Sequence, residues 1–267
     1  MPDPGRTIDK THLSIDQAED RGFIHRDYLA HCFRWSHVVK HLGKKKLYKK
    51  AKIIDIGCGK EIPLLKTLYT MKMTPKEYIA IDVNNISFQD IHRKIMEKMG
   101  DDNFYLKERT DFSEILLPFV DMSYPVDLLY SHVITCFEVL EHNTIPKVIK
   151  ILRNIHEIAN KDTTIFISTP IFNGKAAANH INEMTYEQMH TLLKTSDFDI
   201  MHTYGTFASQ KEIEPVLYET GSNDLTIAYE YLKDYYDSNI LSCFLAPLFP
   251  RYSRNVLWEV KICGNQT

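Results

Sequence analysis

The chain has 267 residues, of which 44% are apolar and 25% are charged, as expected for a globular protein with one large domain. A net charge of -3 gives no overall positive field that would attract nucleic acid, and no apolar run reaches the length of a membrane-spanning helix. The polar, acidic first twenty residues lack the apolar segment of a signal peptide. Five scattered cysteines without a C-x-x-C pair argue against a disulfide framework and predict a reducing, cytoplasmic location.

Apolar periodicity predicts the secondary structure in chain order. Over residues 24–42 apolar side chains recur at steps of three and four, which predicts a helix. From Lys52 onward, short β-branched strands alternate with helical segments. The expected strands cover residues 53–56, 78–82, 104–106, 126–133, 164–168, 198–204 and 256–262. The expected helices between them cover residues 62–69, 88–99, 145–159 and 185–195, the last with a capping box formed by Thr185 and Gln188.

This alternation predicts an α/β fold with a doubly wound, mostly parallel, Rossmann-like sheet of seven strands. We expect residues 1–50 to form an N-terminal arm and helical cap, and residues 51–267 to form the main domain. A helical insertion at 205–252, which contains a tyrosine-rich helix, is expected before the last strand. The basic run KKKLYKKAK at 44–52 is interpreted as a solvated linker, with a phosphate-binding patch as the alternative.

A glycine turn follows the first strand in the segment DIGCG at 55–59. Ligands of open α/β sheets bind at the carboxyl ends of the strands, and Gly57 and Gly59 allow the backbone to turn sharply there. The dinucleotide motif would need a further glycine where this chain has Ile62, and the P-loop motif is absent. The sequence therefore favours a ligand that is not held through phosphates.

Two aspartates describe a nucleoside site beside this turn. Asp82 ends the second strand, where a carboxylate can accept both ribose hydroxyls. Asp111 follows the third strand and can accept a hydrogen bond from an adenine amino group, while Phe112 can pack on the ring. The alternative for either aspartate is a helix cap.

Four segments together resemble the class I S-adenosylmethionine-dependent methyltransferases. They are DIGCG at 55–59, YIAIDVN at 78–84, TDF at 110–112 and CFEVLEH at 136–142. The resemblance covers about residues 50–200. The segment STP at 168–170 and the turn from His180 to Thr185 are similar to a branch that contains small-molecule methyltransferases.

The resemblance implies an enzyme with S-adenosyl-L-methionine as its cofactor. It implies roles for the residues at the strand ends: the methionine portion lies along Asp55, Gly57 and Gly59 with Cys58 in the same turn, the ribose binds Asp82, the adenine amino group binds Asp111 beside Phe112, and Glu138 closes the pocket. The family usually has a third glycine where this chain has Glu61. A side chain there either points to solvent or alters the turn.

Methyl transfer from a sulfonium needs alignment of the reacting atoms and exclusion of water. A base is needed only where the acceptor must lose a proton. His142, just past the fourth strand, and His180, in the loop after the fifth, are the candidate catalytic bases. The alternatives are that His142 packs beside the next helix and that His180 makes a hydrogen bond that fixes its loop.

The same region suggests a metal site as an alternative. Two carboxylates and two imidazoles, from Glu138, Glu141, His142 and His180, could bind a divalent cation. The E-x-x-E-H pattern resembles the small-RNA 3′-end 2′-O-methyltransferases, although metal-free relatives share it.

We therefore expect a methyltransferase that acts on an oxygen or nitrogen of a small-molecule acceptor, without a membrane partner. One alternative is methylation of RNA or a modified nucleotide, including metal-assisted 2′-O-methylation. Another is a non-catalytic cofactor-binding subunit, against which the presence of Asp55, Asp82 and Asp111 argues.

Overall fold

A computed structural model describes residues 26–87, 89–100, 103–114, 131–174, 176–220 and 222–264 of the chain. It describes the backbone but not the side chains of residues 26–28. The expected N-terminal arm lies outside the described residues, as do the first residues of the strand expected at 126–133.

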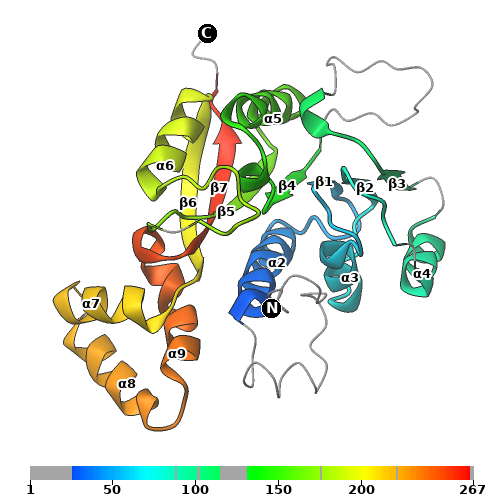
Figure 1. The fold of residues 1–267 in the computed structure, drawn as a ribbon. Helices are drawn as coiled ribbons and strands as arrows, with labels where there is room; N and C mark the ends of the chain where they lie inside the picture. The colour runs from blue at the N-terminus through cyan, green and yellow to red at the C-terminus, as the bar shows by residue number, and fades with distance from the viewer. Residues whose placement is uncertain are drawn as a thin grey trace. The chain divides into compact units, whose positions relative to one another are not determined.

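The sheet has seven strands in the order β3-β2-β1-β4-β5-β7-β6 (Figure 1). The strands are β1 (Lys52–Ile56), β2 (Glu77–Ile81), β3 (Phe104–Lys107), β4 (Val133–Phe137), β5 (Thr164–Pro170), β6 (Phe198–Phe207) and β7 (Asn255–Ile262). The pairings from β3 across to β5 are all parallel. Strand order reverses beside β1, because β1 pairs with β2 on one side and with β4 on the other. The predicted doubly wound sheet is confirmed.

The fourth strand differs from the prediction. It was expected to end at Val133, but β4 begins there, and its residues 133–136 pair with residues 53–56 of β1. The apolar character of the sequence continues from residue 126 to Phe137, so hydrophobicity alone does not locate the paired segment. Pairing with the buried β1 determines the true position, and the predicted boundary is wrong.

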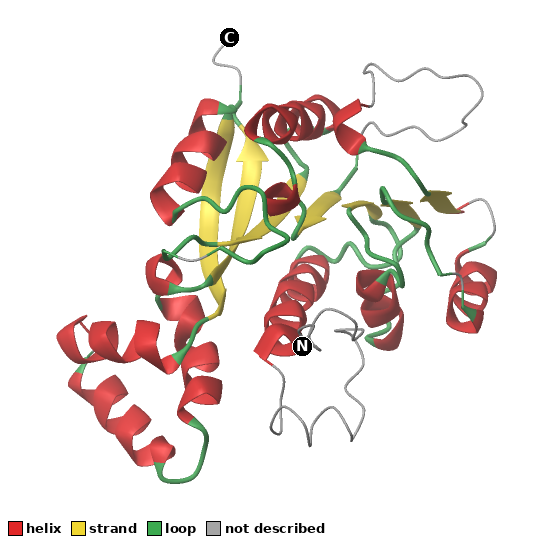
Figure 2. Cartoon of the chain, in the orientation of Figure 1, coloured by secondary structure: helices red, strands yellow, loops and turns green. Residues whose placement is uncertain are grey.

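Helices cover both faces of the sheet, with α3 and α4 on one side and α5 and α6 on the other (Figures 1 and 2). Their bounds are α2 (Arg26–Lys44), α3 (Pro63–Thr70), α4 (Asp90–Met99), α5 (Ile145–Ile158) and α6 (Tyr186–Thr195), with short 3-10 turns η3 (Phe112–Glu114) and η4 (Leu140–His142). The predicted capping box of α6 is confirmed, because the Thr185 hydroxyl accepts a bond from the Gln188 amide and the Gln188 side chain accepts one from the Thr185 amide.

Among the described residues, three helices and two 3-10 turns lie between β6 and β7 in the sequence. They are α7 (Gln210–Thr220), α8 (Asn223–Lys233) and α9 (Ser238–Leu245), followed by η5 (Ala246–Leu248) and η6 (Pro250–Tyr252). Ile213, Leu217 and Tyr229 form a small core there. The tyrosine-rich helix of the insertion was expected to include Tyr235 and Tyr236, but α8 ends at Lys233 and both tyrosines lie beyond it.

Contacts divide the chain into two compact units. One comprises residues 1–36 and 204–256, and the other comprises residues 37–203 and 257–267. The second unit contains β1 to β5 and every residue that the sequence proposes for the site. The site is therefore described within this unit alone.

Candidate active site

The glycine turn after β1 is built so that one position excludes any side chain. Gly57 has φ 68° and Gly59 has φ 75°, both in the left-handed region that favours glycine. A Cβ on Gly57 would lie 2.2 Å from Cγ2 of Val139, which follows β4. A Cβ on Gly59 would lie 3.9 Å from Cδ of Pro63, an ordinary contact. Gly57 is therefore required by both space and dihedral angle, and Gly59 by dihedral angle alone.

Asp82 braces this turn from the end of β2. Its Oδ2 accepts a hydrogen bond from the Gly59 amide at 2.9 Å, and its Oδ1 accepts one from the Asn84 amide at 2.8 Å. The next helix, α4, has Gln89 as its N-cap, so Asp82 does not cap it. The Asn84 side-chain amide also donates to Oδ1, at 3.1 Å, so the remaining capacity for a further donor lies on Oδ2.

Asp55 and Cys58 are buried beside the turn. The Asp55 carboxylate accepts hydrogen bonds from Tyr78 at 2.5 Å and from Thr135 at 2.7 Å, and burial raises its pKa from 3.8 to about 6. Burial likewise raises the pKa of the Cys58 thiol, which keeps it protonated at neutral pH. Asp55 therefore links β1 to the adjoining strands β2 and β4, and its contact with the cofactor's methionine portion stays a prediction.

Asp111 and Phe112 lie after β3, where the adenine is expected. Asp111 Oδ1 accepts bonds from the Ser113 amide and hydroxyl, and Oδ2 accepts one from Lys147 of α5 at 2.6 Å. Partial burial opposes a low pKa for Asp111, but the bonds from Lys147 and Ser113 outweigh it and lower the pKa. Phe112 is buried, and its carbonyl accepts a bond from Asn154 of α5. The two bonds from Ser113 are those expected of a residue that caps the following 3-10 turn η3, which was the alternative to adenine binding for Asp111.

Glu61 stands where the family usually has a third glycine, and its backbone does not have the left-handed dihedral angles that would require glycine. The residue with left-handed dihedrals is the next one, Ile62, at φ 47° and ψ 58°. Glu61 forms an ion pair with Lys66 of α3 at 2.5 Å. Ile62 is fully buried, and a β-branched residue rarely adopts this conformation. Sequence reasoning singled out Glu61 and named Ile62 only as the place where the dinucleotide motif would need a glycine, so it did not predict the left-handed conformation of Ile62.

Glu138 joins the ends of β4 and β5. Its amide donates to the Ser168 carbonyl at 3.0 Å, and its Oε1 accepts a bond from the Ser168 hydroxyl at 2.8 Å. Its φ of 56° turns the chain sharply at the end of β4. Glu138 therefore lies at the strand end where the sequence placed it.

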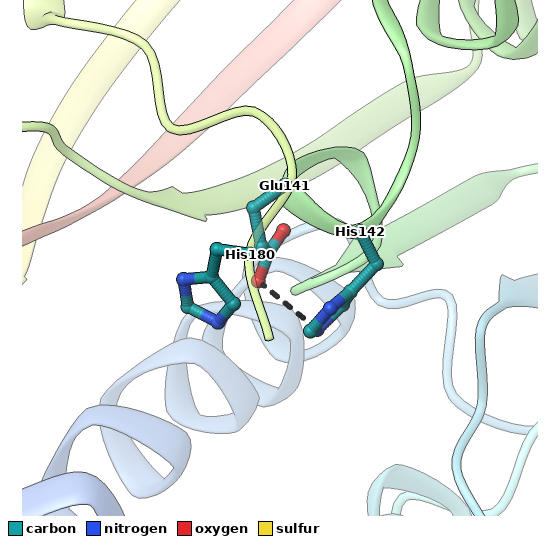
Figure 3. Close-up of side chains that lie close together, drawn as sticks. All are labelled: Glu141, His142 and His180. Carbon is teal, nitrogen blue, oxygen red and sulfur yellow. Dashed lines mark ion pairs between the residues drawn. The ribbon is translucent and has the colours of Figure 1, made fainter. Parts of the chain in front are cut away.

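Glu141, His142 and His180 converge at the same edge of the sheet (Figure 3). Each offers one ligand atom, and these atoms lie within 4.8 Å of one another. His142 Nε2 is 3.8 Å from Glu141 Oε1, and the two imidazole rings are 4.9 Å apart between centroids. The structure thus brings both candidate bases together beside a buried carboxylate. Glu138, the fourth member of the suggested metal set, is not in this group.

The loop between β5 and α6 contacts both histidines, His142 through a backbone carbonyl and His180 through the carboxylate of Glu183. The Glu141 carbonyl accepts bonds from the Ile181 and Asn182 amides at 2.9 and 3.0 Å. His142 Nδ1 lies 3.1 Å from the Asn179 carbonyl oxygen. His180 Nδ1 lies 2.5 Å from Oε1 of Glu183, a residue that the sequence analysis missed although the H-x-x-E spacing was visible.

A family model described as a methyltransferase domain matches residues 27–226. The chain belongs to this methyltransferase family. The resemblance to class I S-adenosylmethionine-dependent methyltransferases is confirmed, and with it the expected enzyme class. A search of curated proteins found no significant sequence match to this chain.

Solved structures share its fold at low identity. The magnesium protoporphyrin IX methyltransferase from Synechocystis PCC 6803 has a TM-score of 0.55 and 11% identity, over 95% of this chain and 89% of that one. The 1,6-didemethyltoxoflavin-N1-methyltransferase from Burkholderia thailandensis has a TM-score of 0.53 and 13% identity, over 88% and 79%. The [4+2]-cyclase SpnF has a TM-score of 0.51 and 14% identity, over 85% and 81%. In the described part of the methyltransferase, no helix is long and apolar enough to cross a membrane.

Proposed function

We propose that this methyltransferase transfers a methyl group from S-adenosylmethionine to an oxygen or nitrogen of a small-molecule acceptor. The observation that carries the proposal is the pair of imidazoles, His142 and His180, beside the braced glycine turn at the carboxyl edge of one sheet. Two structures of the same fold support it by their names, which refer to the small molecules 1,6-didemethyltoxoflavin and magnesium protoporphyrin IX.

We assign the cofactor site to the strand ends of β1, β2 and β4. The methionine portion is assigned to Asp55 and the turn from Gly57 to Gly59, with Glu138 at its edge. The ribose is assigned to Asp82, whose carboxylate is buried and keeps one lone pair, on Oδ2, for a ribose hydroxyl. Asp111 and Phe112 are assigned to the adenine, which requires that Lys147 and the adenine amino group share Asp111 Oδ2 or that Lys147 swings away.

The histidines are assigned to the acceptor. S-adenosylmethionine supplies a methyl group that the positive sulfur already activates. The acceptor atom forms its bond to the methyl carbon as the carbon–sulfur bond breaks, and the acceptor proton passes to an imidazole Nε2. Both Nδ1 atoms lie against oxygen acceptors of the loop after β5, which leaves Nε2 as the available lone pair.

The test begins with calorimetric titration of S-adenosylmethionine. We expect micromolar binding by the wild-type protein and a loss of about 100-fold or more in Asp82→Ala, since a charged hydrogen-bond partner and the turn brace disappear together. Asp90→Ala removes an aspartate whose side chain is 84% exposed, and it should bind normally. Equal binding by Asp82→Ala would remove the ribose assignment. No binding by the wild type would favour a cofactor-binding subunit that needs a partner protein.

The second step is an acceptor screen, with product detected by mass spectrometry. Once an acceptor is found, His142→Ala or His180→Ala should lower kcat by about 100-fold, the usual size of a general-base contribution. Cofactor affinity should not change in either variant. A histidine whose removal leaves turnover unchanged has no part in the mechanism.

One specific observation favours a second candidate, metal-assisted methylation of an RNA 2′-hydroxyl. Glu141, His142 and His180 present a carboxylate and two imidazoles within 4.8 Å, a ligand set suited to a divalent cation. Titration of Mn²⁺ or Co²⁺ into the protein tests it, with Glu141→Gln and His142→Ala as variants that should lose binding. RNA methylation that requires the cation, with an RNA affinity that falls steeply with salt, would establish this candidate over the small-molecule one.

We further propose the division into an N-terminal cap at 1–50 and a main domain at 51–267, with a helical insertion at 205–252 before the last strand. We also propose a cytoplasmic location. The free thiols of all five cysteines support this location, because disulfides are rare in the reducing cytoplasm. Limited proteolysis tests the division, because cleavage near residue 50 and within 205–252 should precede cleavage of the main domain.

A further inference from the structure

Glu183 carries a carboxylate that the fold alone does not explain. Its side chain is only 2% exposed, and its Oε1 accepts bonds from His180 Nδ1 at 2.5 Å and from the Ala177 amide at 2.9 Å. Its Oε2 is buried and has no hydrogen-bond partner among the described residues. Burial of an incompletely bonded carboxylate costs free energy, so this side chain needs a reason beyond packing.

The contact with His180 supplies that reason. An ionised carboxylate only accepts hydrogen bonds, so the proton of the neutral imidazole belongs on Nδ1 and the lone pair on Nε2. A charge-assisted bond of this length also fixes the plane of the ring. Carboxylates that hold the far nitrogen of a histidine orient the ring in the same way in catalytic sites and in metal sites.

The backbone around Glu183 is itself fixed. The Ile181 and Asn182 amides between the two residues donate to the Glu141 carbonyl, which ties this segment to η4. The Phe172 amide donates to the Met184 carbonyl at 2.9 Å, just after Glu183. Glu183 therefore acts on His180 from a rigid support, and rotation of the loop does not relieve the buried carboxylate.

We propose that Glu183 is a positioning residue that holds His180 as the Nδ1–H tautomer, so that Nε2 offers its lone pair beside Glu141 and His142. The consequence for turnover rests on the proposed function, whereas the tautomer itself does not. Glu183 touches neither acceptor nor cofactor in this assignment and acts only through His180.

Nitrogen-15 NMR of histidine side chains tests the proposal, with the His180 signals assigned by their loss in His180→Ala. We expect the wild type to show the Nδ1–H form of His180, and Glu183→Ala to show the Nε2–H form as well. Glu183→Gln keeps an oxygen that can accept the Nδ1 proton and should restore the Nδ1–H form. Glu187→Ala, at an exposed glutamate on α6, should match the wild type.

An Nε2–H form in the wild-type protein would overturn the proposal, and this result needs no variant to fold. The same conclusion follows if Glu183→Ala folds, binds S-adenosylmethionine normally and keeps the wild-type tautomer. With an acceptor in hand, Glu183→Ala should lower kcat by about 10-fold to 100-fold while KM stays constant. A failure of the proposed function is distinguishable, because it would show as absent cofactor binding or methyl transfer with the tautomer pattern intact.

Discussion

Gly57 and Val139 approach each other so closely that a single added carbon on Gly57 would lie 2.2 Å from the valine Cγ2. The contact joins the turn after β1 to the segment after β4, at the reversal of strand order. The shape of the assigned cofactor turn therefore depends on a residue from a distant part of the chain.

Gly57→Ala should lower the free energy of unfolding by at least about 2 kcal/mol, through the combined effects of left-handed dihedrals and the collision with Val139. Gly59→Ala should cost less, about 1–2 kcal/mol, because it meets the dihedral penalty without the collision. Chemical denaturation measures both. The double variant Gly57→Ala/Val139→Ala should recover part of the loss, and strict additivity of the two single changes would contradict the contact.

Glu61→Gly should not improve the cofactor site. The strained backbone position is Ile62 rather than Glu61, so a glycine at 61 relieves no strain, although it removes the ion pair with Lys66. We expect the Kd for S-adenosylmethionine to change by less than about threefold, since the left-handed conformation of Ile62, and with it the shape of the turn, stays the same. A gain of tenfold or more in affinity would show that the missing family glycine does weaken the turn.

Asp55→Asn should change how stability depends on pH. Burial raises the Asp55 pKa from 3.8 to about 6, so between these pH values the folded state binds more protons than the unfolded state. The free energy of unfolding contributed by Asp55 therefore falls as pH rises through this window, by about 3 kcal/mol in total. The asparagine variant lacks this fall.

Urea denaturation at pH 4 and pH 7 measures the effect as the difference between Asp55→Asn and wild type. The partly buried histidines His37 and His41, whose pKa values are lowered to about 4 by burial and by nearby lysines, titrate in the same window but are common to both proteins. Asp90→Asn, at an exposed aspartate, serves as the control. A difference between the two proteins that is the same at both pH values would contradict the raised pKa of Asp55.

Thr185→Ala should destabilise the start of α6 by about 1 kcal/mol, the usual cost of losing an N-cap side chain. The threonine hydroxyl accepts the Gln188 amide, so Thr185→Ser should preserve most of the stability. Thermal unfolding of the three proteins measures this. Equal stability of the alanine and serine variants would mean that water replaces the cap without cost.

Sequence reasoning predicted those features that depend on local pattern. The capping box at Thr185 and the glycine turn at 57–59 follow from short-range rules, and both are present. It misplaced β4 because the apolar run there is longer than the paired strand, and only pairing with β1 selects the segment. Val139 could not be recognised, since it matters through Gly57, which lies far away in the chain and which folding brings near. Glu183 lies three residues after His180, and the spacing was visible, but the spacing alone does not show that the two side chains bond.

The backbone bonds that anchor the loop after β5 determine which side chains of the site can be replaced. Glu141 receives the Ile181 and Asn182 amides through its main-chain carbonyl, a group present whatever side chain occupies position 141. The side chains at 141, 142 and 180 can therefore be exchanged without releasing these backbone bonds. Different catalytic side chains could therefore be engineered at these three positions, because the backbone bonds that anchor the loop do not depend on the side chains that would be replaced.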